Sequence, residues 1–494
     1  MPKIFLITSL PYPSQLGGDN GGPDKDLPNF VKAWNARYES PQLVISTHEH
    51  LFTEFEVKYG NLIPKLEGEM TPFWEDGAFS TVQETMLVRK AADRLIQAEA
   101  LYSLYHPESY SNEAFYKAWQ QVILWDEHTW GAWNCVSDLD LSFVKEQWQI
   151  KQCFAIQSDK LSKELINHLM HGDELSYDSK AVVLFNTSSQ PCGEVVLLPN
   201  GFIPQSRNVL CQTVEDGYVA VMVVFDKGWQ QKVLIVNHEM RQEQPKIEAS
   251  SSILENEQMR ICFDENNGTI TSLWHKVQKK EYVAQEKHLL ELIYLSGKYQ
   301  QESSVITDVC IPKTAKGQLF DQLEFTGKLK GCNNVQISLK LNHYLDRLDI
   351  DLIIDKQAIR KKESLHFAFP IGLDEGVLRY DCAGKPIEPE IDQLPGSCKN
   401  FFSPTSYVDV SDEECGITVS LPDVPLIEIG DITAEIPWKE SIEPSTTFYS
   451  YVLNNYWHTN YKTNKSGVMT FRYSILLHGK LNEGELHCFA QSQR

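Results

Sequence analysis

Apolar residues recur at helical spacing in three consecutive segments of the first third of the chain. The segments cover residues 84–105, about 112–126 and 143–169, and charged residues fill the positions between the apolar ones. The third segment is expected to turn its apolar residues to the core and to stop at Gly172; these residues are Phe143, Ile150, Phe154, Leu161, Leu165 and Leu169. A period of about 3.6 residues predicts amphipathic helices. Because the links between the segments are short, we expect the three helices to pack together as a bundle.

Beyond Lys180 the period changes from about 3.6 residues to two, which predicts β-strands. At residues 259–273 two such runs flank Asn267-Gly268, a strong signal of a β-hairpin. Four early runs predict a small β domain, and the later runs continue to the C-terminus and predict a large antiparallel sandwich. The early runs are residues 182–185, 195–198, 218–225 and 232–236, and the later ones include 348–354, 416–421 and 469–477.

The first residues predict only a fragment of an α/β domain. Helices are expected near residues 30–38 and 51–59, with a short buried strand at 43–46 between them. One strand cannot form a sheet alone. We therefore expect the chain to start inside a domain whose earlier part is missing or supplied elsewhere.

Together the patterns predict a multidomain α+β protein of four parts. These are a remnant of an α/β domain at 1–72, a three-helix domain at 73–178, a small β domain at 179–248 and a large β domain at 249–494. A Pro-rich connection at 385–404 has the composition of a loop that reaches over a site or a neighbouring domain.

Composition narrows the class of partner. The formal net charge of −22 repels phosphate backbones and anionic lipids, which argues against nucleic acid and membrane surfaces and is compatible with a neutral substrate such as a sugar. No apolar run approaches the roughly 20 residues of a membrane span. The eleven cysteines include no Cys-x-x-Cys pair, so we expect a reducing, cytoplasmic setting.

Between residues 119 and 134, charged and polar side chains cluster at the end of a predicted helix. Asp126, Glu127 and His128 follow the apolar helical pattern, and Gly131 lies among tryptophans after them. An imidazole beside carboxylates is held in one tautomer, as a metal ligand or a proton-transfer group requires. The neighbouring tryptophans could form an apolar floor for a sugar. A packing role for His128 is the alternative.

Four motifs in this order resemble the α-mannosidases of glycoside hydrolase family 38. They are Thr71-Pro-Phe-Trp-Glu-Asp-Gly77 with Glu84, Thr85 and Arg89; Asp126-Glu-His-Thr-Trp-Gly131; the hairpin at 259–273; and Asn454-Asn-Tyr-Trp-His-Thr-Asn-Tyr461 with Phe471-Arg-Tyr473. The resemblance covers about residue 17 to the end. It implies the C-terminal portion of such an enzyme, lacking most of the N-terminal catalytic α/β domain and ending in a mutarotase-like supersandwich.

The resemblance also implies zinc-dependent hydrolysis of α-mannosides with retention of configuration. In the family a zinc ion is held by a His, an Asp and an Asp nucleophile of the α/β domain and by one His of the helical domain, whose position is that of His128. Gly18-Asp19-Asn20 is similar to the acid/base loop, which makes Asp19 the catalytic candidate, with a turn-capping role as the alternative. Thr129 stands where many relatives carry an aspartate, and this departure is expected to weaken the hydrogen-bonding support of the His128 ring.

The candidate substrate-binding residues are Asp126, Trp130, Trp457, His458 and Tyr461, since aromatic faces stack on sugar rings. Core packing is the alternative for the last three. His48 and His50 are predicted to diverge on a surface helix rather than to hold a metal.

Two functions follow from the sequence. One is an incomplete α-mannosidase-like hydrolase that binds an α-mannoside, with a missing N-terminal half or a second copy as its protein partner. The other is a non-catalytic carbohydrate-binding module. Because no His-x-Asp pair and no candidate nucleophile precede Asp19, we expect little or no turnover by the chain alone.

Overall fold

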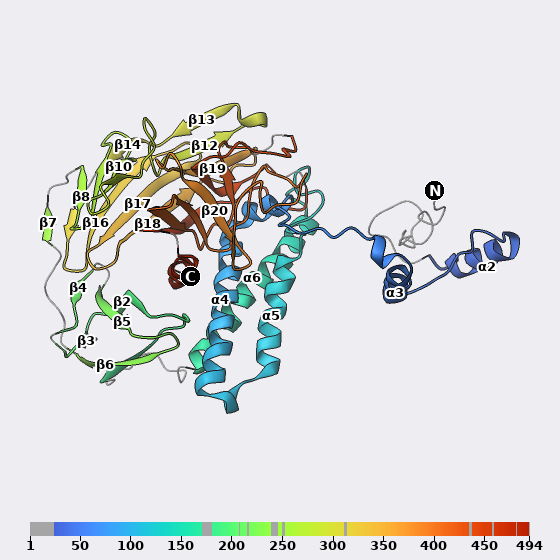
Figure 1. Cartoon of the computed structure of the whole chain (residues 1–494), viewed down its shortest axis with the longest axis horizontal. Helices are drawn as coiled ribbons and strands as arrows, with labels where there is room; N and C mark the ends of the chain where they lie inside the picture. Colours follow the sequence, from blue (N-terminus) through green and yellow to red (C-terminus); the bar gives the residue numbers. More distant parts are fainter. Residues whose placement is uncertain are drawn as a thin grey trace. The chain divides into compact units, whose positions relative to one another are not determined.

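The computed structural model of the chain describes ten stretches of residues (Figure 1). They are 24–169, 180–206, 208–214, 217–238, 246–248, 252–310, 314–433, 437–456, 459–480 and 482–493, without the side chains of 75 and 76. The chain divides into two compact units, Met1–Glu67 and Gly68–Arg494. None of the helices in these stretches is both long and apolar enough to cross a lipid bilayer.

The part of the smaller unit that the structure describes, residues 24–67, contains the two predicted helices, α2 (Leu27–Arg37) and α3 (His48–Tyr59), and a short 3-10 turn at Gly60–Leu62. The strand predicted at 43–46 is wrong. The side-chain amide of Asn35 bonds both the N–H and the carbonyl oxygen of Leu43, each at 2.8 Å, so a side chain takes the place of a partner strand.

Three long helices form a bundle, which confirms the prediction for this region. They are α4 (Val82–Tyr105), α5 (Asn112–Asp126) and α6 (Ser142–Leu169), preceded by the 3-10 segment η2 (Glu75–Thr81), and η3 (Pro107–Ser109) links the first two. Figure 1 shows them side by side, and a shared apolar core with Leu95, Phe115 and Trp125 holds them together. The Ser111 hydroxyl accepts the N–H of Ala114 and so caps α5. Gly172, the expected stop of the third helix, lies outside the described residues.

The inward face of α6 differs from the predicted one. Phe143 and Ile150, expected in the core, are 52% and 62% exposed. The buried positions instead follow a seven-residue spacing. They are Val144, Lys151, Ala155, Ser158, Ser162, Leu165 and Leu169.

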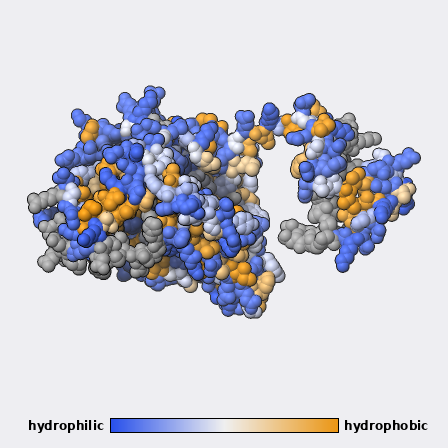
Figure 2. Space-filling view, turned by 90° about the horizontal axis from the view of Figure 1, so that it is seen from below, coloured by the Kyte–Doolittle hydropathy of each residue, from blue (hydrophilic) through white to orange (hydrophobic). Residues whose placement is uncertain are grey.

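Six short strands follow the bundle and form two three-stranded antiparallel sheets around a common core. The sheets are β1-β6-β3 and β2-β5-β4, from β1 (Ala181–Phe185), β2 (Cys192–Pro199), β3 (Ile203–Pro204), β4 (Cys211–Thr213), β5 (Tyr218–Phe225) and β6 (Gln231–Asn237). Along β6, Leu234 and Val236 are buried while Val233 and Ile235 are exposed, as strand alternation requires. Figure 2 shows hydrophobic surface at the end of the larger unit where Figure 1 places β3 and β6.

The remaining strands form a large antiparallel sandwich. A four-stranded sheet (β11-β10-β9-β8), a five-stranded sheet (β13-β12-β19-β25-β24) and an eleven-stranded sheet (β21-β20-β22-β23-β26-β18-β17-β16-β15-β7, with β14 on β16) share one hydrophobic core. This confirms a mixed helical and β-rich architecture with a C-terminal sandwich. The short helix α7 (Glu483–Ser492) ends the chain, with its buried Leu486 beside Tyr407.

The bounds of these strands are β7 (Lys246–Glu248), β8 (Ile253–Glu255), β9 (Met259–Phe263), β10 (Ile270–His275), β11 (Lys280–Glu281), β12 (Leu292–Ser296), β13 (Glu302–Val305), β14 (Thr307–Cys310), β15 (Thr314–Lys316), β16 (Phe320–Lys328), β17 (Cys332–Asn342), β18 (Arg347–Lys356), β19 (Glu363–Pro370), β20 (Val377–Cys382), β21 (Lys385–Ile387), β22 (Tyr407–Ser411), β23 (Gly416–Ser420), β24 (Ile427–Ile429), β25 (Thr447–Asn454) and β26 (Gly467–His478). The predicted hairpin is the β9–β10 pair. Gly268 in its turn has a φ of +71°, and a side chain there would collide with the Phe325 ring.

The Pro-rich connection at 385–404 does reach over a neighbouring segment. Its residue Gln393 pairs in parallel with Glu69, and the Thr71 hydroxyl donates to the carbonyl oxygen of Cys398. The Tyr380 hydroxyl, on β20, donates to Glu69 Oε2 at 2.8 Å. This connection thus anchors the segment that leads into the motif at 71–77.

Candidate functional site

The C-terminus of α5 is held by a buried lysine from α6. Lys151 Nζ donates to the carbonyl oxygens of Leu124 at 3.0 Å and of Glu127 at 2.7 Å. A cation here pairs with the negative end of the helix dipole. Desolvation lowers the pKa of Lys151 although Glu127 and Asp126 oppose the shift. Lys151 was not predicted; its signal in the sequence is a lysine at one of the positions, seven residues apart, that α6 buries.

The Glu127 carboxylate, directly after α5, is held from two sides. Its Oε1 accepts the Thr129 hydroxyl at 2.7 Å, and its Oε2 accepts the Thr129 N–H at 3.1 Å and lies 3.5 Å from Lys151 Nζ. Desolvation acts in the opposite direction, but these partners hold the pKa of Glu127 below its ordinary value. Thr129 therefore restrains the carboxylate that lies beside the His128 ring. The weaker support expected from its departure from the family pattern stays a prediction.

His128 lies on the surface at this helix end. Its side chain is 62% exposed, and its Nδ1 lies 2.7 Å from Glu127 Oε1. The Trp74 ring packs against the imidazole, with 5.3 Å between the ring centroids. Since Trp74 belongs to the motif at 71–77, the first two of the four motifs meet here. The partner role of Trp74 was not predicted, because the two residues are distant in sequence.

Asp126 is the last residue of α5 and is solvent-exposed. Desolvation by the surrounding protein raises the pKa of Asp126 against the attraction of Lys151 and Arg89. Arg89 itself is anchored to the sandwich, where its guanidinium donates to the carbonyl oxygens of Pro422 and Thr405. Asp126 therefore lies near two cations, and its contact with a substrate stays a prediction.

Trp130 and Tyr461, both candidate substrate-binding residues, are buried. Trp130 is 6% exposed in the bundle core, and Tyr461 is 4% exposed beside Ala132 and Cys135. The Tyr461 hydroxyl donates to the carbonyl oxygen of Asn455 at 3.3 Å. Tyr461 thus has the environment that its packing alternative describes, and Trp130 lies in the bundle core. The contact of either ring with a sugar stays a prediction.

The other three candidate site residues, Asp19, Trp457 and His458, lie outside the described residues. Exposed aromatic side chains lie on nearby segments, and only Trp133 among them belongs to the tryptophans expected to form an apolar floor for a sugar. Phe73 packs against Trp438 with 4.8 Å between ring centroids, and both are exposed. Trp133 is also exposed, and its carbonyl oxygen accepts the Thr459 hydroxyl at 3.1 Å.

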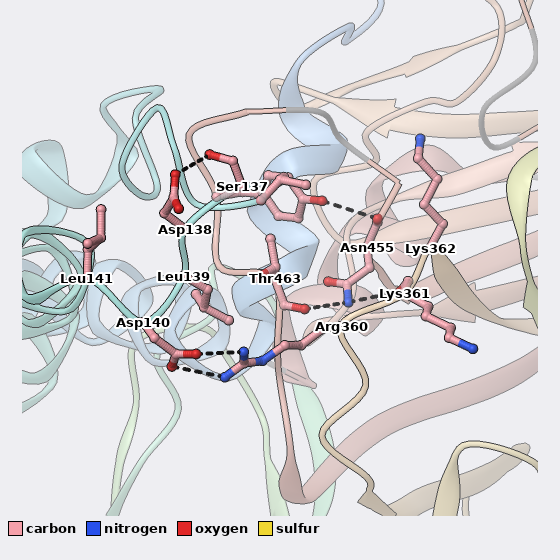
Figure 3. Close-up of a pocket in the computed structure, with 12 residues that line it drawn as sticks. Ser137, Asp138, Leu139, Asp140, Leu141, Arg360, Lys361, Lys362, Asn455 and Thr463 are labelled. Carbon is pink, nitrogen blue, oxygen red and sulfur yellow. Dashed lines mark hydrogen bonds and ion pairs between the residues drawn. The ribbon is translucent and has the colours of Figure 1, made fainter.

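Tyr461 also lines a cavity of about 560 Å³ (Figure 3). Its lining residues come from the loop before α6, from the turn after β18 and from the segment after β25: Val136 to Leu141, Arg360 to Lys362, Asn455, Tyr461 and Thr463. The Arg360 guanidinium binds both oxygens of Asp140, at 2.9 and 3.1 Å, so these opposite charges already satisfy each other. In Figure 3 the Lys361 and Lys362 ammonium groups point away from this ion pair.

The described residues do not assemble a complete metal site. Among them, no three His, Cys, Asp or Glu side chains form a group that could hold a metal ion. His128 offers one imidazole of the type that zinc binds. The remaining ligands of the expected site are not supplied by this part of the chain.

Comparison with protein families finds a match within the large β domain. The family model described as "Glycosyl hydrolases family 38 C-terminal domain" matches residues 254–422. This stretch therefore carries the C-terminal domain of glycosyl hydrolase family 38, which confirms the resemblance drawn from the four motifs. No curated protein sequence matches the chain significantly.

Two solved structures from Enterococcus faecalis share the fold. An alpha-mannosidase from strain V583 has a TM-score of 0.62 at 13% identity, covering 94% of this chain and 63% of that one. A protein in glycosyl hydrolase family 38 has a TM-score of 0.62 at 13% identity, covering 95% and 65%. The chain spans just under two thirds of the length of either structure. A galactose mutarotase-like protein from Lactobacillus casei has a TM-score of only 0.30, so the mutarotase-like character stays a prediction.

Proposed function

We propose that the chain is the C-terminal portion of an α-mannosidase-like glycoside hydrolase that cleaves α-mannosides. One observation carries this proposal: His128 stands exposed at the end of α5 between Glu127 and Trp74, within a chain that carries a family 38 C-terminal domain. A half-exposed tryptophan beside a polar ring suits a sugar, which presents an apolar face and a hydroxyl edge.

The zinc ion implied by the resemblance is part of the proposal. Among the described residues no hydrogen-bond partner engages Nε2 of His128, so this atom is free to act as one ligand. When bound, zinc would supply a clamp on sugar hydroxyls that favours ring distortion. The described residues form no group of three ligands around such an ion.

Retaining hydrolysis needs two carboxyl groups roughly 5 Å apart, one as nucleophile and one as acid and base. Asp19 is the acid/base candidate, and the chain offers no candidate nucleophile before it. We therefore expect little or no turnover by the chain alone, and activity only when the missing part of the fold is supplied.

The second candidate function is a carbohydrate-binding module without catalysis. The exposed aromatic side chains Phe73, Trp74, Trp133 and Trp438 favour it, since such rings bind sugars without further chemistry. We further propose a cytoplasmic location, supported by the absence of disulfides among the eleven cysteines. A second copy of the chain stays a candidate partner.

Turnover and binding together test these proposals. An aryl α-mannoside and the matching aryl β-mannoside are offered, with zinc, to the chain alone and to the chain joined to the polypeptide encoded immediately upstream. We expect the longer polypeptide alone to cleave the α-mannoside, and His128→Ala to abolish the cleavage. Calorimetric binding of mannose oligosaccharides without any hydrolysis would favour the module, and neither binding nor hydrolysis would overturn both.

A further inference from the structure

A series of contacts connects the core of the helix bundle to His128: Lys151 contacts Glu127, and Glu127 contacts His128. Lys151 is buried in the bundle, where three oxygen atoms surround its ammonium group: two backbone carbonyls at 2.7 and 3.0 Å and Glu127 Oε2 at 3.5 Å. Its position is therefore fixed by the packing of α5 against α6. Through these contacts the backbone and the carboxylate of Glu127 are both tied to the bundle.

Thr129 restrains the same carboxylate from the other side. Its N–H and its hydroxyl bind one oxygen each, at 3.1 and 2.7 Å. The Glu127 carboxylate is thus a fixed acceptor although nearly half of its surface is exposed. The oxygen bound by the Thr129 hydroxyl is the one that lies 2.7 Å from Nδ1 of His128.

We propose that Glu127, held by Lys151 and Thr129, is a positioning residue that keeps the proton of the neutral His128 ring on Nδ1 and leaves Nε2 unprotonated. A bare nitrogen lone pair 2.7 Å from a carboxylate oxygen would be repelled, whereas an N–H at this distance is attracted. The tautomer of a histidine is set in this way by the partner of its other nitrogen. The free Nε2 lone pair then faces away from Glu127, available to a metal ion.

The zinc part of this inference rests on the proposed function, but the tautomer does not. Loss of a carboxylate that orients a ligating histidine commonly costs 10-fold to 100-fold in metal affinity. Because Glu127 is half exposed, solvent weakens its effect. We expect the lower end of that range, about 10-fold.

The tautomer is measured directly by long-range proton–nitrogen NMR of the full chain labelled with nitrogen-15 in histidine, at a pH where the ring is neutral. His128→Gln assigns the signal by its disappearance. We expect the Nδ1–H form in the wild type and a shift toward the Nε2–H form in Glu127→Gln. The matched control is Glu113→Gln, which alters an exposed carboxylate on the same helix, paired with Lys117, and should leave the signal unchanged. An Nε2–H form in the wild type, or no change in Glu127→Gln, would overturn the proposal.

Titration with zinc of the same variants, each joined to the polypeptide encoded immediately upstream because the described residues supply no complete metal site, separates the two proposals. We expect Glu127→Gln to bind zinc about 10-fold more weakly than the wild type and Glu113→Gln to match the wild type. If the wild type binds no zinc but shows the tautomer shift, the positioning role stands and the zinc proposal fails. Equal zinc affinity of the wild type and Glu127→Gln, with binding lost in His128→Gln, would contradict positioning. Should Glu127→Gln fail to fold by circular dichroism, Thr129→Val replaces it, with the same direction expected.

Discussion

A β-carbon placed on Gly131 would lie 2.9 Å from both the carbonyl carbon and the carbonyl oxygen of Tyr461. Backbone meets backbone at this point, so only a residue without a side chain fits. The contact joins the segment after α5 to the segment after β25, and thus the second of the four motifs to the fourth. It fixes the end of the bundle, where His128 stands, against the sandwich.

Replacement of Gly131 by alanine should therefore destabilise the fold. We expect Gly131→Ala to lower the free energy of unfolding by about 1 to 3 kcal/mol, as overpacking usually does. Urea unfolding followed by tryptophan fluorescence measures the change. Gly479→Ala is the matched control, since its new carbon would meet nothing closer than 3.9 Å, and it should stay within about 0.5 kcal/mol of the wild type. Equal stability of the two variants would contradict the contact.

Asp423 forms ion pairs with both the bundle and the sandwich and so links the two. Its buried carboxylate accepts Nε and a terminal nitrogen of Arg472 at 2.9 and 3.0 Å, and Lys90 of α4 lies 3.2 Å away. Both cations are partly exposed, which reduces their cost when unpaired. We expect Asp423→Asn to lower the free energy of unfolding by roughly 2 to 4 kcal/mol at neutral pH. Asp308→Asn, which alters an exposed pair with Lys328, should change it by less than about 1 kcal/mol.

The same ion pairs give an acid dependence with a defined sign. Desolvation would raise the pKa of Asp423, but Arg472 and Lys90 outweigh it and hold this pKa below its ordinary value. The contribution of the pair is therefore complete above about pH 4 and is lost as the pH falls through the depressed pKa of the folded state. The stability difference between wild type and Asp423→Asn should shrink over that acid range in urea titrations. A difference that stays constant would contradict the assignment.

Lys465 should give stability the opposite kind of pH dependence. Complete burial lowers the pKa of Lys465 to about 7, against the attraction of Glu363. Between about pH 7 and pH 10 the unfolded chain then binds a proton that the folded chain lacks, so folding stability rises with pH. We expect the wild type to gain about 1.4 kcal/mol per pH unit relative to Lys465→Met over this window. Parallel stability curves of the two proteins would show that the buried amine stays charged.

Gln212 clamps the small β domain to the large sheet. Its Oε1 accepts the N–H groups of Leu319 and Phe320, and its Nε2 donates to the Phe320 carbonyl oxygen. Gln212→Leu leaves three buried backbone groups without these partners, so we expect a loss of about 2 to 4 kcal/mol in the free energy of unfolding. The control Gln205→Leu removes a single bond of 3.3 Å at an exposed position and should have little effect. A similar loss in both variants would contradict the clamp.

Local patterns were sufficient to predict most of the fold. The bundle helices follow from the apolar periodicity and the β9–β10 hairpin from Asn267-Gly268, signals that act within a few positions of the chain. The strand at 43–46 was wrong because Asn35, eight positions away, satisfies Leu43. The buried face of α6 was predicted wrongly. An apolar pattern gives no reason to bury Lys151, whose partners Leu124 and Glu127 lie on α5 and directly after it.

Only part of the candidate site could be predicted from the sequence, again because many of its contacts are non-local. Glu127 and His128 are neighbours in sequence, so their contact could be inferred from the sequence alone. The supports from Lys151 and Trp74 depend on the packing of α5 against distant segments, which a single sequence does not reveal. Trp130 and Tyr461 are buried on two segments that meet at Gly131, and this contact is equally non-local.

Anomalous X-ray scattering at the zinc absorption edge tests most directly whether His128 is a metal ligand. Crystals of the chain joined to its upstream polypeptide, grown with zinc, should show a peak about 2.0 to 2.1 Å from Nε2 of His128. The peak should vanish in His128→Ala, while the contacts of Glu127 and Lys151 persist. A fully occupied zinc site remote from His128, or a peak that survives the substitution unchanged, would contradict the proposed role of this residue.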